Sequence, residues 1–168
     1  MSNANAPFGA RPVNSRGAEI QGRPYKAKAS TAIYKGDFVT ADAAGTVDVS
    51  AAAEAILGVA AEYKAAADTD RTILVYDDPD FIYEIQADGD FAAADVFKNA
   101  DIVAGAGSTT LLQSGHVLDS STMDTTATLQ LKILGLASVA ENAVGSYARV
   151  LVKINNATLG SHTGTVGV

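Results

Sequence analysis

Ser114, His116 and Asp119 lie within the short segment SGHVLD, and serine, histidine and aspartate are the residue types of a nucleophilic triad. The members of a triad are brought together by the fold rather than by close spacing. The sequence also has no G-x-S-x-G turn of the kind that exposes a nucleophilic serine. The only other histidine is His162, and there is no cysteine. We therefore expect the chain not to be an enzyme, unless a histidine lies in a pocket beside an activated nucleophile.

A glycine-rich segment, GAGS at 105–108, has the composition of a phosphate-binding loop. It lacks the Lys-Ser/Thr pair that follows in such loops, and it lacks the strand-to-helix setting that lets backbone amides receive phosphate. We expect an ordinary loop between strands here and no bound cofactor.

An acidic cluster could offer oxygen ligands to calcium. Its spacing is not that of an EF-hand, and aspartate is common in turns because its side chain bonds the local backbone. We expect solvated turns and no metal, and we keep as the alternative function a calcium- or sugar-binding β module of a phage or bacterial surface fibre. The cluster consists of Asp77, Asp78, Asp80, Asp88 and Asp90.

The charges are distributed unevenly along the 168 residues. Residues 1–35 contain six basic side chains and one acidic side chain, whereas residues 36–168 contain six basic and 18 acidic ones. The net charges are therefore +5 and −12, within a total of −7. We call residues 1–35 the leader. The charge asymmetry predicts that the leader contacts a negatively charged surface, which could be nucleic acid, an acidic protein or a neighbouring copy of this chain. We do not expect direct nucleic-acid binding, because Phe8 and Tyr25 are the only aromatic residues at 4–25.

Residues 1–24 are expected to form an extended arm. Three of the four prolines lie there, and each removes a backbone donor, so a helix is not expected. The arm has few large apolar groups to offset an ordering cost of about 1–2 kcal/mol per residue, so we expect another surface to order it. The expected partner interface consists of the apolar anchors Phe8, Val13, Ile20 and Tyr25, with Arg11, Arg16 and Arg23 as partners for carboxylates.

Residues 25–155 are expected to form a β body. Turn residues recur roughly every 8–12 positions, which is typical of an all-β sandwich or barrel. Apolar and polar residues alternate most clearly in TLQLKILGL and YARVLVKIN, which we expect to pair as antiparallel core strands. The prediction is a mainly β protein with a single antiparallel β-barrel or β-sandwich body and at most one short helix, near 92–96. Residues 156–168 would be a second arm or an edge strand.

Further strands are predicted along the body. Strands at 38–40 and 47–49 are expected to form a hairpin around Ala44-Gly45, followed by an apolar run in which Gly58 marks a bulge or a close approach. A second hairpin is expected to pair 73–76, covered on both faces, with 81–85. The apolar runs are too short to span a membrane, so we expect no membrane partner.

Several segments together resemble the small capsid cement, or decoration, proteins of tailed bacteriophages. The resemblance spans nearly the whole chain and lies in the general pattern of these segments rather than in a single diagnostic motif. The segments are ANAPFGARPV, YKGDFVTADAAGTVDVSAAAEAILGVAAE, NADIVAGAGSTTLLQSGHVLDSS, LQLKILGLA and ARVLVKIN.

This resemblance implies a structural virion protein, made in the bacterial host cytoplasm and bound to the outer surface of an icosahedral phage head. Such proteins cement neighbouring major capsid subunits and are commonly trimers near threefold positions. The implied partners are the major capsid protein and two further copies of this chain. The resemblance offers no catalytic residues.

Overall fold

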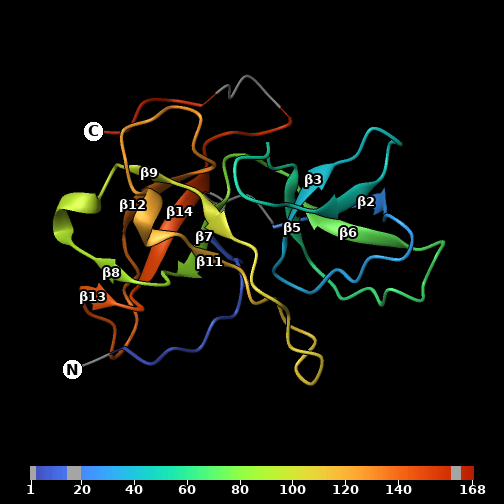
Figure 1. Ribbon diagram of the computed structural model, residues 1–168, viewed down its shortest axis with the longest axis horizontal. Coiled ribbons are helices and arrows are strands. Elements are labelled where there is room, and N and C mark those ends of the chain that lie inside the picture. The colour runs from blue at the N-terminus through green and yellow to red at the C-terminus, as the bar shows by residue number, and fades with distance from the viewer. Residues whose placement is uncertain (1–2, 15–19, 160–163) are drawn as a thin grey trace.

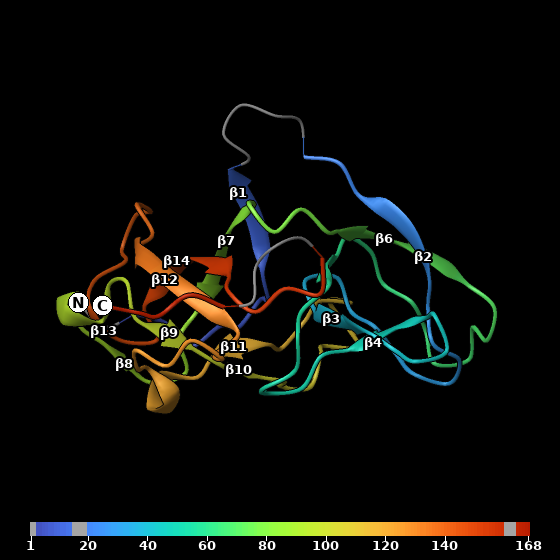
Figure 2. The same cartoon turned by 90° about the horizontal axis from the view of Figure 1, so that it is seen from above.

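The computed structural model describes residues 3–14, 20–159 and 164–168. Two five-stranded sheets lie side by side along the long axis of the molecule (Figure 1). The view from above shows the same arrangement, with β1 and β7 on one side of the gap between them and β2 and β6 on the other (Figure 2). All pairings between the named strands are antiparallel. The mainly β, antiparallel fold class is therefore confirmed, and the body is sandwich-like.

The first sheet, sheet A, is centred on the two strands with the clearest sequence alternation. Leu131 pairs with Ile154 and Ile133 with Val152, so the predicted antiparallel core pair is confirmed. All four side chains are buried because successive residues of a strand point to opposite faces. The order of sheet A is β1 (Arg11–Asn14), β7 (Ile82–Gln86), β14 (Arg149–Ile154), β12 (Leu131–Leu136) and β9 (Asn99–Ala100).

The second sheet, sheet B, contains the first predicted hairpin. Gly45 has a φ of 76° in its turn, a conformation that glycine adopts without strain. Gly58 lies where a side chain would collide with the carbonyl oxygen of Tyr76 on the neighbouring strand, which confirms the predicted close approach. The order of sheet B is β2 (Arg23–Lys26), β6 (Thr72–Tyr76), β5 (Gly58–Ala60), β3 (Phe38–Ala41) and β4 (Val47–Val49).

Short elements complete the fold. No α-helix occurs among the described residues; the segment expected to compete as a short helix forms one 3₁₀ turn, and a second turn follows Asp119. The short elements are the pair β8 (Asp90–Phe91) and β13 (Gly145–Ser146), the pair β10 (Ile102–Val103) and β11 (Val117–Leu118), and the 3₁₀ turns η1 (Ala93–Asp95) and η2 (Ser120–Thr122).

One apolar core joins the two sheets. Phe38 and Val59 of sheet B belong to the same buried cluster as Tyr83 and Val152 of sheet A. A buried amide reinforces this contact: the Gln130 Nε2 group donates to the carbonyl oxygens of residues 51 and 54, both at 2.8 Å. Its Oε1 atom accepts from the backbone of residue 102 at 3.1 Å. The buried Gln130 side chain thus bonds backbone groups from both halves of the molecule.

The described residues of the leader are extended, but they lie along this chain's own sheets. β1 forms the edge of sheet A against β7, and β2 forms the edge of sheet B against β6. Pro12 and Pro24 lie in these edge strands. Proline is tolerated at a sheet edge because its missing N–H group does not interrupt the hydrogen bonds between central strands. This corrects the expectation that another molecule must order the leader, since its backbone is stabilised by completing both sheets.

The basic side chains of the leader also meet acids of the same chain. Lys28 lies 2.9 Å from Asp42 and 2.6 Å from Asp48, and Lys26 lies 2.9 Å from Asp70. The negatively charged surface inferred from the charge asymmetry is therefore partly the chain's own body.

The second predicted hairpin is wrong. β6 belongs to sheet B and β7 to sheet A, and residues 77–81 carry the chain from one sheet to the other. Leu74 is half exposed, so β6 is not covered on both faces either. Both strands are apolar enough to pair with each other, and local sequence does not indicate which sheet each one joins.

The described part of the C-terminal tail contacts the body. Ala157 makes a single parallel bridge to Ile56, and no longer strand forms in residues 156–159 and 164–168. The Gly167 amide donates to the carbonyl of Thr125 at 2.9 Å. The described tail is thus held by isolated hydrogen bonds rather than by an edge strand.

Candidate interaction site

The residues expected to contact a partner differ in their exposure to solvent. Phe8 is 6% exposed, so the side chain expected to anchor a partner is instead buried in its own chain. Arg11, Val13 and Ile20 are exposed and remain candidates. Arg16 lies outside the described residues.

Arg23 and Tyr25 converge on one buried carboxylate. The Arg23 Nε atom lies 3.5 Å from the Asp77 Oδ2 atom, and the Tyr25 hydroxyl donates to the same oxygen at 2.6 Å. Partial burial, together with Asp77, raises the pKa of Tyr25. These two side chains therefore hold β2 against the crossover between the sheets.

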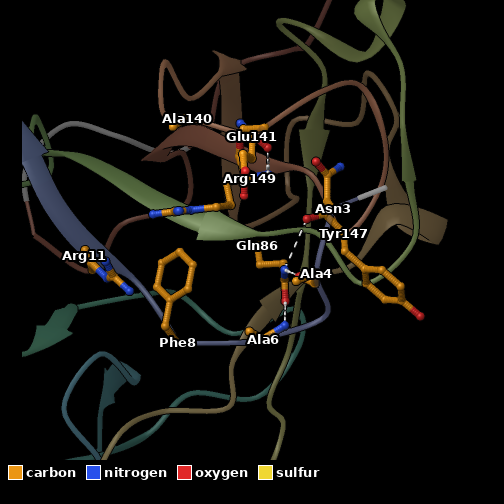
Figure 3. Close-up of a pocket in the computed structure, with 11 residues that line it drawn as sticks. Asn3, Ala4, Ala6, Phe8, Arg11, Gln86, Ala140, Glu141, Tyr147 and Arg149 are labelled. Atoms are coloured by element: carbon orange, nitrogen blue, oxygen red, sulfur yellow. Dashed lines mark hydrogen bonds between the residues drawn. The ribbon is translucent and has the colours of Figure 1, made fainter. Parts of the chain in front are cut away.

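A pocket of about 350 Å³ lies beside Phe8 at one end of sheet A. We call it the Phe8 pocket; Figure 3 shows its lining. The Arg11 guanidinium carbon lies 3.9 Å from the centre of the Phe8 ring, and that of Arg149 lies 5.2 Å from it. Both are within the range of cation–π attraction. The ring therefore forms an apolar wall that carries two guanidinium groups.

The N-terminal segment closes one side of this pocket through hydrogen bonds. The Gln86 Nε2 group donates to the carbonyl of Ala4 at 2.7 Å, and the Ala6 amide donates to the Gln86 Oε1 atom at 3.1 Å (Figure 3). The Asn3 side chain donates to the carbonyls of Ala143 and Ser146, each at 2.9 Å. These bonds fasten residues 3–6 to β7 and to the connection between β12 and β14.

Arg149 is incompletely partnered. One of its terminal nitrogens is paired with Glu84, while its buried Nε atom has no hydrogen-bond partner among the described residues. Glu141 and Tyr147, which also line the pocket, each have a φ of 59°. Left-handed backbone at residues other than glycine is strained, and such strain clusters at functional sites.

The structure places Ser114 and His116 together, but it brings Asp37 rather than Asp119 to them. The His116 Nε2 atom lies 3.5 Å from the Asp37 Oδ1 atom, and Nδ1 accepts from the Phe38 amide at 3.3 Å. Burial lowers the pKa of His116, and burial raises the pKa of Asp37. Ser114, His116 and Asp37 are all buried, and Asp119 instead caps η2.

The acidic cluster is engaged within the chain. Asp80 lies 2.5 Å from the Lys153 ammonium, Asp88 accepts from the Ser120 backbone at 2.8 Å, and Asp90 accepts from Ser146. Within residues 3–14, 20–159 and 164–168, no group of three or more histidine, aspartate or glutamate side chains is arranged to hold a metal ion.

Sequence reasoning missed an apolar protrusion between β10 and β11, which projects from the body in Figure 1. We call residues 105–115 the finger. At its base a side chain on Gly105 would collide with the Gly115 carbonyl, so the two backbone segments pack directly together. At its tip Leu111 is 72% exposed and Leu112 is 43% exposed. The two adjacent leucines in a Gly/Ser/Thr-rich loop were the sequence feature that could have predicted this protrusion.

Comparison with known proteins identifies no relative of this chain. No family model matches the chain, no curated protein matches it, and no solved structure matches it. No helix in the described part of the chain is long and apolar enough to cross a membrane.

Proposed function

We propose that this chain is a capsid cement protein that binds the outer surface of a tailed-phage head and joins neighbouring major capsid subunits. The observation that carries the proposal is the finger. Exposed leucines on a projecting loop are unfavourable in water and are stabilised when a partner covers them. A second line of support is the sequence resemblance to cement proteins. We propose a homotrimer located on the virion as the working assembly.

The finger is built to keep its tip in one shape. The Ser108 amide donates to the Gln113 carbonyl at 2.8 Å, and the Leu111 amide donates to the Ser108 hydroxyl at 3.1 Å. The Ser114 amide donates to the Lys35 carbonyl at 2.9 Å, which fastens the finger to the body. A preorganised loop loses little conformational freedom on binding, so more of the burial energy contributes to affinity.

Cementing by this route is a mass-action effect. A protein that binds the assembled shell but not its dissociated subunits stabilises the shell by RT ln(1 + L/Kd) per site, where L is the concentration of the free protein. Modest apolar contacts repeated over many sites are therefore sufficient to stabilise the shell. The leader contributes by completing both sheets of the body that presents the finger, rather than by lacing across subunits as a free arm.

The test uses expanded heads of the encoding phage prepared without this protein. Burial of one leucine contributes about 1.5–3 kcal/mol, so Leu111→Asp is expected to weaken shell binding by about tenfold or more. Val144→Asp is the matched control, because Val144 is 56% exposed on a loop outside the finger. Failure of the unaltered protein to bind heads would refute the proposed function. If the Leu111 variant bound heads as tightly as the unaltered protein, the finger would be excluded as the binding element.

The alternative of a calcium-binding module gains no support from the described residues. Asp77, Asp80 and Asp88 make ion pairs or hydrogen bonds within the chain, so their carboxylate oxygens are already engaged. Calorimetric titration with calcium separates the two functions, since the cement protein requires no ion.

A further inference from the structure

The Phe8 pocket contains a cation that has no acidic partner among the described residues. The Arg11 guanidinium stacks on Phe8 and makes no ion pair with any described residue. Arg149, on the same ring, is paired with Glu84 through one terminal nitrogen, and its side chain is 32% exposed. A guanidinium group presents its N–H donors in a fork that matches a carboxylate. The exposed parts of these two guanidinium groups therefore offer donors that an anion could accept.

The charges around the pocket favour a monoanion over a dianion. The charged groups that line or support it are Arg11, Arg149, Glu84 and Glu141. These four charges sum to zero, so a carboxylate paired with Arg11 adds one negative charge beside the two glutamates, whereas a phosphate dianion adds two. The ligand chemistry that fits is thus a carboxylate rather than a phosphate.

The remaining lining favours a carboxylate carried on a short apolar stem. Phe8 supplies an aromatic wall, and Ala4, Ala6 and Ala140 supply methyl groups. Such a mixed lining, with a few placed polar groups, is usual in ligand sites. Methylene groups leading to the carboxylate would pack on this apolar part while the charge meets the guanidinium groups.

The pocket is formed before any ligand arrives. The Asn142 side chain donates to the carbonyls of Ala137 and Arg149, each at 2.8 Å, and accepts from the Arg149 amide at 2.9 Å. These bonds fix the loop in which Glu141 and Tyr147 hold their left-handed backbone. Together with the bonds of Asn3 on the opposite side, they make both walls rigid, which lowers the entropy lost on binding.

We propose that the Phe8 pocket binds the carboxylate of a glutamate or aspartate side chain of a partner polypeptide, held by Arg11 and Arg149. This inference is independent of the cement function, because it can be tested on the isolated chain. It extends to Arg149 and to a formed pocket the carboxylate-binding role that the sequence predicts for Arg11.

The test follows the side-chain Nε–Hε signals of Arg11 and Arg149 by NMR, with the full ¹⁵N-labelled chain. The probe is the peptide acetyl-Gly-Glu-Gly-amide, and its matched control carries glutamine in place of glutamate. We expect both arginine signals to shift saturably with the glutamate peptide, and binding of the glutamine peptide to be weaker by about tenfold or more.

Two variants and one control locate the binding. Arg11→Gln removes the unpaired cation from an exposed position and is expected to weaken peptide binding about tenfold. Ala140→Glu adds a carboxylate at the rim of the pocket and is expected to weaken it by repulsion. Arg71→Gln is the control: Arg71 pairs with Glu62 beside sheet B and lies outside the pocket. Unchanged backbone amide signals elsewhere show that each variant is folded.

Several results would overturn the proposal. These are equal binding of the glutamate and glutamine peptides, an undiminished affinity in Arg11→Gln, or no saturable shift at millimolar peptide. Inorganic phosphate binding as tightly as the peptide would overturn the preference for a carboxylate. Acetate binding as tightly would overturn the polypeptide source. None of these results bears on whether the chain binds phage heads.

Discussion

Replacing Phe8 by alanine tests whether the leader belongs to the fold. Phe8 is 6% exposed and carries two guanidinium groups on its ring. Truncation of a buried phenylalanine costs about 3–5 kcal/mol of unfolding free energy. Because an open pocket adjoins the ring, the surroundings can relax and water can enter, so we expect about 3 kcal/mol, at the lower end of that range. This estimate includes the cation–π contacts, which alone contribute about 0.5–1 kcal/mol each at exposed sites.

Urea unfolding followed by far-UV circular dichroism measures this effect. The matched control is Phe97→Ala, because Phe97 is 53% exposed and its truncation is expected to change stability by only about 0.5 kcal/mol. A loss at Phe8 below about 1 kcal/mol, or equal to that at Phe97, would refute the conclusion that the leader packs on its own body. An arm waiting for a partner would give that result.

Three further predictions concern the buried polar groups and the close approach of two strands. Gln130→Leu should lower the unfolding free energy by about 2 kcal/mol or more in a urea titration, because the Ile102 amide and two carbonyls lose their partner. The lowered pKa of His116 means that the unfolded chain binds its proton more readily, so stability should fall as the pH drops below about 6.5; the raised pKa of Asp37 acts in the opposite sense. A pH series of urea midpoints in which His116→Gln follows the same curve as the unaltered chain would contradict this. Gly58→Ala should lower the melting temperature, since the added methyl group collides with β6 at a cost of about 1–3 kcal/mol, whereas Gly45→Ala in an open turn meets no neighbouring atom and suffers only backbone strain.

The expected functions differ in how far the structure supports them. The cement function remains a proposal, argued from the sequence resemblance and from the exposed leucines of the finger. The partner interface expected from the leader loses Phe8 to the core and keeps Arg11, Val13 and Ile20 on the surface. A site that requires both Arg11 and Arg149 was not visible in the sequence, because these residues are 138 positions apart.

The sequence alone determined the features that depend on local geometry. Alternation of side chains predicted β12 and β14 as an antiparallel core pair, since a period of two places one set of side chains on the buried face. The hairpin around Gly45 and the close approach at Gly58 followed from the conformational freedom and small size of glycine.

Tertiary structure alone decided the neighbours of the leader strands and of β6 and β7. The prolines of the leader predicted an extended chain, but only two open sheet edges could accept strands containing Pro12 and Pro24. β6 and β7 follow each other in sequence yet join different sheets, and Asp37 meets His116 across 79 positions. Strand pairing and burial depend on the free energy of the whole core, and local patterns specify a face of a strand without specifying its partner.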